Sequence, residues 1–166
     1  MLSSSAIEEM LAAARRYAAG FDKGDLPTPP AKKVAVLACM DSRMDLFALL
    51  GLKVGDAHVI RNAGGVVTDD AIRSLTLSQR LLGTEEIVLI HHTGCGLLGI
   101  SDEEFAEGLE AETGARPEWR ARGFADIEHA VRDAIAAVKA CPFIPHRDNV
   151  RGFVYEVETG ALREVV

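Results

Sequence analysis

Two short apolar runs, each followed at once by residues that can bind a metal ion, constrain the fold of this chain more than any other feature. The run 34–38 leads into Cys39-Met-Asp-Ser-Arg43, and the run 87–90 leads into His92-Thr-Gly-Cys95. Continuous apolar runs of this length are typical of strands buried on both faces, as in a parallel sheet. Because the carboxyl ends of parallel strands meet at one edge of the sheet, we expect the two fragments to lie close together.

The rest of the chain alternates between helical and strand-like patterns. We expect helices over 4–21, 44–50, 69–82, 101–112 and 125–140, and strands over 34–38, 57–60 and 86–90. Thr68 is well suited to cap the helix that follows it. After residue 150 the pattern alternates around a Thr-Gly pair at 159–160, which predicts a β-hairpin or a strand with a returning edge. This order predicts an α/β fold with three layers, in which helices flank a mostly parallel central sheet.

The length of 166 residues fits one domain, 1–166, with an N-terminal helical arm and connector over 1–30 and a metal-binding core over 31–166. No apolar stretch approaches the roughly 20 residues of a membrane-spanning helix. The first residues also lack the basic flank and apolar core of a secretion signal. Together with an odd count of 3 cysteines, these features predict a cytoplasmic protein with reduced thiols rather than a disulfide framework.

The net negative charge of the chain argues against binding to nucleic acids or anionic membranes. With 25 acidic against 18 basic residues and a formal net charge of −7, the chain lacks the basic excess that nucleic acids or anionic membranes attract. The mean hydropathy is nevertheless +0.10, which suggests apolar surface hidden in a subunit contact. The apolar stripe of the first helix, from Ile7 to Phe21, is one candidate for that contact, although it could also pack on its own subunit.

The two fragments offer two thiolates and one imidazole from Cys39, Cys95 and His92. Two Cys and one His form a zinc set that leaves one position for water, which is the coordination of a catalytic site. Alternate residues of an extended segment share a face, so Asp41 should stand beside the metal and Arg43 should pair with Asp41. We therefore predict hydration or hydrolysis by a zinc-bound hydroxide that this pair orients. Freed from Arg43, Asp41 could instead become a fourth ligand and close the site.

Two alternative functions remain open at this point. A structural zinc site, closed by Asp41 or Cys141, would make the chain a non-catalytic interaction module. The pattern G-x-G-x-x-G over 94–99 would suit a nucleotide-binding domain, but no strand ending in an acidic residue follows about 20 positions later. His91 is interpreted as a packed or hydrogen-bonded side chain, because only His92 gives the His-x-x-Cys spacing.

These motifs resemble those of the β-class carbonic anhydrases, and the short chain is similar to their compact microbial and archaeal branch. The resemblance rests on residues 39–43, on Arg61-Asn-Ala-Gly-Gly65 and on His92-Thr-Gly-Cys-Gly96, and it covers roughly 32–166. It implies reversible hydration of carbon dioxide to bicarbonate, with Zn²⁺ on Cys39, His92 and Cys95 and with Asp41 and Arg43 as the catalytic dyad.

The resemblance also bears on substrate and assembly. It implies that the backbone N–H of Gly96 contacts the substrate, and we assign Asn62 and Gly64 of the third strand-end segment to the same pocket. It implies a homodimer, which could pair further into a tetramer, with the N-terminal helix lying across the partner. Plant-type members have a substrate-contacting glutamine where this chain has Pro30. Relatives of the compact branch hydrolyse carbonyl sulfide or carbon disulfide, so hydrolysis of such a sulfur analogue is the alternative activity.

Overall fold

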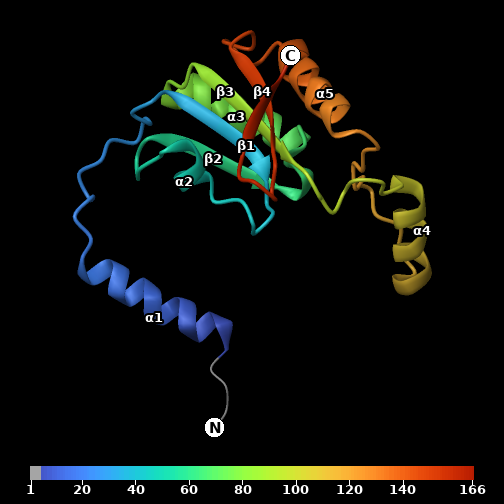
Figure 1. The fold of residues 1–166 in the computed structure, drawn as a ribbon, viewed down its shortest axis with the longest axis horizontal. Coiled ribbons are helices and arrows are strands. Elements are labelled where there is room, and N and C mark those ends of the chain that lie inside the picture. The colour runs from blue at the N-terminus through green and yellow to red at the C-terminus, as the bar shows by residue number, and fades with distance from the viewer. Residues whose placement is uncertain (1–4) are drawn as a thin grey trace.

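The computed structural model describes residues 5–166, and its centre is one five-stranded sheet in the order β2-β1-β3-β4-β5 (Figure 1). The strands are β1 (Val34–Cys39), β2 (Ala57–Asn62), β3 (Glu86–His92), β4 (Val150–Tyr155) and β5 (Leu162–Val165). The first four strands are parallel, and β5 returns antiparallel to β4. The expected mostly parallel sheet and the terminal hairpin are both confirmed.

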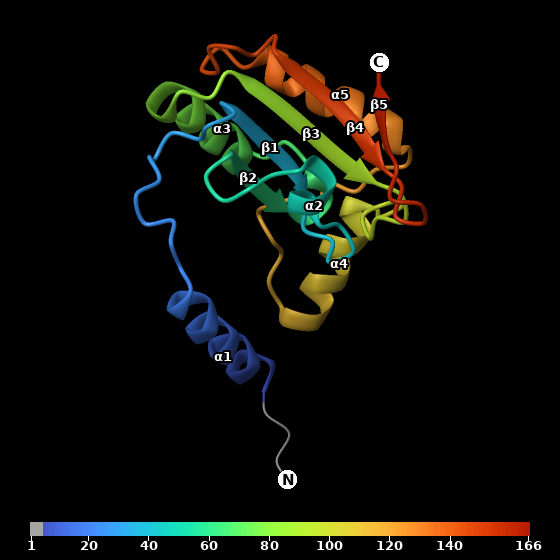
Figure 2. The ribbon, with the colours of Figure 1, turned by 60° about the vertical axis from the view of Figure 1, so that its left-hand side comes forward.

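Helices flank the sheet on both faces (Figure 2). The helices of the described chain are α1 (Ala6–Ala19), α2 (Leu46–Leu50), α3 (Asp69–Leu82), α4 (Asp102–Thr113) and α5 (Ile127–Ala140), with a 3-10 turn η1 at Ala63–Gly65. Of these, α2, α3 and α5 pack on the sheet. One core cluster packs β1 and β3 against α3 and α5, through residues such as Leu37, Leu75 and Leu89. A second cluster on the opposite face joins Val36 and Ile90 to Leu46 of α2. The predicted three-layer fold is therefore confirmed.

Strand pairing fixes where the two ligand fragments lie. Ala38 of β1 is paired with Ile90 of β3, and Cys39 is paired with Asn62 of β2. Cys39, Asn62 and His92 each close a strand of this parallel set. Three chain segments that are distant in sequence therefore emerge at one edge of the sheet, as expected.

Local capping explains the small differences from the expected helix bounds. The Thr68 hydroxyl accepts a hydrogen bond of 3.1 Å from the Ala71 N–H, so α3 starts where the sequence predicts. The helix expected from residue 125 starts two residues later, because Asp126 caps it by accepting from the His129 N–H at 2.6 Å. Asp45 likewise caps α2, which begins at Leu46 rather than at residue 44.

The N-terminal arm extends away from the sheet (Figures 1 and 2). Helix α1 contains no buried residue, and the side chains of Ile7, Met10 and Tyr17 are 68%, 69% and 61% exposed. Among the described residues the apolar stripe therefore does not pack on its own subunit. The expected helix start at residue 4 lies outside the described residues. The division into an arm over 1–30 and a core over 31–166 remains a prediction.

None of the helices within residues 5–166 combines the length and the apolar composition that crossing a membrane requires.

A tight glycine turn joins β2 to α3 beside the end of β1. Gly64 and Gly65 both have positive φ, 81° and 65°. A Cβ atom built on Gly65 would lie 2.8 Å from the Cys39 backbone nitrogen and 2.9 Å from the Ile90 carbonyl oxygen. These neighbours are backbone atoms that cannot rotate away, so only glycine fits where the turn meets β1 and β3.

We predict that Gly65→Ala lowers the free energy of unfolding by about 3 kcal/mol or more, because strain and a backbone clash add together. Gly51→Ala is the matched control, since Gly51 has φ 62° but open space around its Cβ position. It should cost only the left-handed backbone penalty of about 1 kcal/mol. Urea unfolding monitored by circular dichroism measures both values, and equal costs would contradict the close-approach argument.

Candidate metal centre

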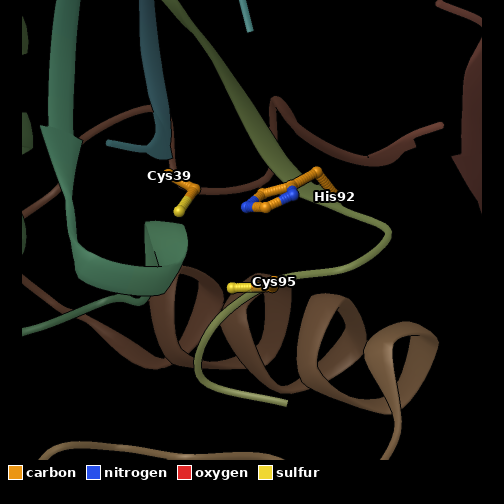
Figure 3. Close-up of side chains that lie close together, drawn as sticks. All are labelled: Cys39, His92 and Cys95. Carbon is orange, nitrogen blue, oxygen red and sulfur yellow. The ribbon is translucent and has the colours of Figure 1, made fainter. Parts of the chain in front are cut away.

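Three side chains meet at the carboxyl edge of the sheet (Figure 3). The sulfur atoms of Cys39 and Cys95 and a ring nitrogen of His92 all lie within 4.8 Å of one another. All three residues are buried. Ligand atoms that share one zinc ion at about 2.0–2.3 Å must have separations of this order. The three residues expected to bind metal are therefore brought together.

The hydrogen bonding of His92 prepares its ring for a cation. Its Nδ1 lies 2.8 Å from the Thr93 carbonyl oxygen, an acceptor, so Nδ1 must carry the proton. Its Nε2 is buried and has no hydrogen-bond partner among the described residues. A buried nitrogen lone pair without a donor is costly unless a cation occupies the site. The residues present thus fit a divalent metal with thiolate and imidazole ligands, of which Zn²⁺ is typical.

The protein environment favours the thiolate form of one cysteine. Burial opposes ionisation of Cys39, but the His92 ring and the backbone groups of Asp41 and Gly64 outweigh it and lower the thiol pKa to about 7. The Cys39 sulfur in turn raises the pKa of His92. Burial raises the pKa of Cys95, with the nearby Cys39 adding to the effect. Cys39 is therefore the thiol that ionises first, and a cation would be needed to hold both sulfurs as thiolates.

Asp41 and Arg43 form a bidentate pair beside this cluster. The Asp41 carboxylate accepts from Arg43 Nε at 2.9 Å and from Arg43 Nη2 at 2.8 Å. It also accepts from the Arg43 backbone N–H at 2.9 Å. These hydrogen bonds hold the pKa of Asp41 well below its usual range. Asp41 Oδ2 lies 3.7 Å from His92 Nε2, so an ionised carboxylate borders the cluster as the sequence predicts.

A residue that the sequence analysis left without a role anchors this segment. Arg61, at the end of β2, donates hydrogen bonds to the carbonyl oxygens of Cys39 at 2.9 Å, Asp41 at 2.7 Å and Met44 at 3.1 Å. The planar guanidinium can satisfy three acceptors at once, which an ammonium group cannot do in this geometry. Arg61 therefore fixes the backbone that carries both a thiol and the Asp41–Arg43 pair.

A cavity of about 440 Å³ is lined by Asn62, Gly96 and Leu97, among others, and Gly96 directly follows Cys95 in the chain. Two of the three residues assigned to the substrate pocket thus face one space. The Asn62 amide nitrogen donates to the Val66 carbonyl at 2.9 Å, while its buried Oδ1 has no partner among the described residues. Gly64 is buried, and the Leu97 side chain fills the space where its Cβ would lie, so its assignment to the pocket remains a prediction.

Two further candidates lie away from the cluster. His91 is buried on β3, and its ring packs against Phe124 with centroids 5.6 Å apart. Burial lowers the pKa of His91 to about 4, and the neighbouring His92 adds to that shift. Cys141 belongs to the core cluster formed with α3 and α5, not to the cluster that contains Cys39 and Cys95. The alternative of Cys141 as a fourth ligand is therefore wrong.

Comparison of the sequence with known proteins identifies the family of this chain. Residues 34–162 match the family model described as carbonic anhydrase. The chain is 52% identical over 149 residues to beta-carbonic anhydrase 1 of Mycobacterium tuberculosis, covering 90% of this chain and 91% of that protein. It is 34% identical over 156 residues to a carbon disulfide hydrolase of Acidithiobacillus thiooxidans, covering 81% and 78%.

The fold is also similar to that of solved structures. A carbonic anhydrase from Streptococcus mutans superimposes with a TM-score of 0.92 at 42% sequence identity, covering 99% of this chain and 100% of that chain. The likeness therefore extends from the sheet to the projecting N-terminal arm.

We predict that Arg61→Met weakens zinc affinity by about 10- to 100-fold, the usual effect of losing a group that orients metal ligands. Competition with a chromophoric chelator measures the affinity, and thermal unfolding measures stability in parallel. Arg73→Met is the matched control, because Arg73 is an exposed arginine that pairs with Asp70 at 3.2 Å. Unchanged zinc affinity in the Arg61 variant would show that the three carbonyl contacts do not position the ligands.

Proposed function

The chain belongs to the β-class carbonic anhydrases, and from this premise we propose that it catalyses the reversible hydration of carbon dioxide to bicarbonate at a zinc centre on Cys39, His92 and Cys95. One observation carries the proposal. Two thiols and an imidazole nitrogen converge within 4.8 Å beside a carboxylate that is itself held by a bidentate arginine. A donor set of three leaves a coordination position for the reacting water, as catalytic zinc sites require.

A bound zinc ion supplies a Lewis acid that lowers the pKa of water. Two thiolates reduce the net charge of the site and weaken that effect relative to an all-histidine site, so the reacting water needs help from the protein. Asp41 supplies it by accepting a hydrogen bond from the water and directing an oxygen lone pair toward the substrate carbon. The depressed pKa of Asp41 keeps the carboxylate ionised and able to accept.

Arg43 holds Asp41 in the position where it can accept from the reacting water and keeps it from binding the metal. Besides its two bonds to the carboxylate, Arg43 Nη2 donates to the Gly94 carbonyl at 2.9 Å. The arginine is thereby tied to the segment that carries Cys95, and the carboxylate cannot swing inward without losing both bonds. In our proposal this arrangement prevents Asp41 from becoming a fourth ligand, which would exclude water from the site.

The cavity lined by Gly96 and Asn62 suits a small, weakly polar substrate. Leu97 and Val66 give it apolar walls, while Gly96 and Asn62 contribute polar backbone and amide groups. We propose that the Gly96 N–H donates to a substrate oxygen and that Asn62 and Gly64 shape the same pocket. Carbon disulfide is the second candidate substrate, because the chain is also similar to a carbon disulfide hydrolase at 34% identity.

We also propose a homodimer in which α1 lies across the partner subunit. The support is the exposed apolar stripe on a helix with no buried residue, since patches of this kind mark interaction sites. Such a dimer could pair further into a tetramer. The expected cytoplasmic location and the expected lack of a nucleic-acid partner stay predictions.

For the zinc-loaded protein we predict rapid hydration of carbon dioxide in stopped-flow assays and little release of hydrogen sulfide from carbon disulfide.

Arg43→Ala should lower kcat for hydration by about 100-fold with zinc still bound, because Asp41 loses the partner that orients it. Zinc content is measured on the same samples.

Arg73→Ala is the control for the general loss of an aspartate-paired arginine, and it should retain the wild-type kcat. A zinc-replete Arg43→Ala enzyme with wild-type kcat would contradict the proposed dyad. A wild-type protein that releases hydrogen sulfide efficiently but does not hydrate carbon dioxide would instead favour the second substrate.

For the dimer, we predict that Leu11→Glu shifts the protein toward the monomer in light scattering coupled to size-exclusion chromatography. The substitution places a charge on the apolar stripe, which would be buried in the interface. Ala19→Glu adds the same charge to the same helix outside the stripe, and it should leave the mass unchanged. A wild-type protein that is monomeric at micromolar concentration would contradict the proposal.

A further inference from the structure

The C-terminal hairpin contacts the short segment that joins His92 to Cys95. The turn between β4 and β5 lies beside the chain where it leaves β3 (Figure 2). His92 and Tyr155 are the last register pair of the β3–β4 ladder. One residue further on, the Thr93 N–H still donates to the Tyr155 carbonyl oxygen at 2.9 Å. The ladder therefore continues as far as the residue that follows His92.

The next hydrogen bond of this ladder is made by a side chain instead of the backbone. In a parallel ladder, a residue that donates to one residue of the next strand accepts at its carbonyl from the residue two positions further on. The Thr93 carbonyl is thus the expected acceptor for the Val157 N–H. That N–H instead donates to Thr93 Oγ1 at 3.0 Å. The hydroxyl therefore takes the place of the carbonyl of the same residue.

The Thr93 carbonyl is thereby left free for the imidazole of His92. It accepts from His92 Nδ1 at 2.8 Å, so Nε2 is the ring nitrogen that keeps a lone pair. A group that holds the second nitrogen of a metal-binding histidine fixes both its tautomer and the orientation of its ring. The exchange of acceptors at Thr93 therefore determines where the Nε2 lone pair points.

Glu158, on the β4–β5 turn, fixes the rotation of the Thr93 hydroxyl. The hydroxyl donates to Glu158 Oε2 at 2.8 Å, so its lone pairs remain available to the Val157 N–H. The Thr93 hydroxyl lowers the pKa of Glu158, and the nearby Arg43 guanidinium contributes to the shift. The carboxylate is therefore ionised at neutral pH and able to accept.

The other residue between the two ligands is held as well. The Gly94 carbonyl accepts from Arg43 Nη2 at 2.9 Å. Hydrogen bonds thus fix both intervening residues, one from the hairpin and one from the Asp41–Arg43 pair. Only the contacts of Thr93 act directly on the ring of His92.

We propose that Thr93 is a positioning residue of the metal centre, with Glu158 as its partner on the β4–β5 turn. The hydroxyl occupies the ladder position so that the carbonyl can hold His92 with Nε2 toward the ion. This role rests on the zinc centre proposed above. It gives the C-terminal hairpin a part in metal binding, although Thr93 acts only through His92.

A second threonine of the same turn provides a matched control. The Thr159 hydroxyl donates to Glu156 Oε2 at 3.1 Å and accepts from the Ala161 N–H at 3.2 Å. Thr159 thus makes the same two kinds of hydrogen bond as Thr93, but both stay within the turn. Thr159→Val therefore measures what losing such a hydroxyl costs the hairpin alone.

The test compares Thr93→Val, Thr93→Ser and Thr159→Val in the full-length protein. Thr93→Val keeps the side-chain shape but removes the hydroxyl, so the Val157 N–H must compete with His92 for the carbonyl at position 93. We predict a zinc affinity about tenfold or more weaker, measured by competition with a chromophoric chelator. The visible absorption spectrum of the cobalt-substituted protein should change too. Thr93→Ser restores the hydroxyl and should restore both properties.

Thr159→Val should lower the thermal unfolding temperature of the metal-free protein about as much as Thr93→Val, with wild-type zinc affinity and cobalt spectrum. Wild-type zinc affinity in Thr93→Val, equal losses of affinity in Thr93→Val and Thr159→Val, or no rescue by Thr93→Ser would each overturn the positioning role. These readouts need no turnover. A wild-type protein that binds zinc but does not hydrate carbon dioxide would therefore contradict the proposed function alone, whereas one that binds no zinc would overturn both proposals.

A second pair of variants carries the comparison if Thr93→Val does not fold. Glu158→Ala removes the acceptor that orients the Thr93 hydroxyl, and it should weaken zinc affinity by about threefold. Glu158→Gln keeps an acceptor at the same place and should retain the wild-type affinity. Equal zinc affinities in these two variants would overturn the role of the hydroxyl.

Discussion

Parallel pairing of β1 with β3 sets the separation of the two ligand segments, because Ala38, directly before Cys39, is the register partner of Ile90, two residues before His92. The neighbouring turn at Gly65 contacts the backbone of both strands and leaves no room for a side chain. Arg61 then ties the β1 segment down through three carbonyl groups. Two thiolates at this distance repel each other. The surrounding backbone, fixed by these contacts, holds the two cysteines together against that repulsion.

Much of this arrangement could be predicted from the sequence, because the signals are local. The apolar runs before Cys39 and His92 identify buried strands, and the capping residue Thr68 marks the start of a helix. The Asp41–Arg43 pair was expected from the two-residue period of an extended segment, and the structure shows the pair as bidentate. The backbone there forms a turn instead, in which the Met44 N–H donates to the Asp41 carbonyl at 3.3 Å and the Arg43 N–H donates to the Asp41 carboxylate at 2.9 Å. Where a strand period or a cap determines the geometry, the expected bounds agree to within about two residues.

The remaining features depend on contacts that have no local signature. Arg61 acts on residues 17 to 22 positions away, and this contact becomes visible only once β1 and β2 are paired. The exposure of α1 depends on packing as well, since an apolar helical stripe looks the same in sequence whether it covers its own core or a partner.

The central claim is that three protein ligands hold zinc and leave one position to solvent. X-ray absorption of the zinc-loaded enzyme above neutral pH tests it most directly. The account predicts two sulfur neighbours at about 2.3 Å, one imidazole nitrogen at about 2.0–2.1 Å and one further light atom that exchanges with solvent. A spectrum that requires four protein ligands at every pH, or a Cys39→Ser variant that keeps both sulfur neighbours, would contradict it.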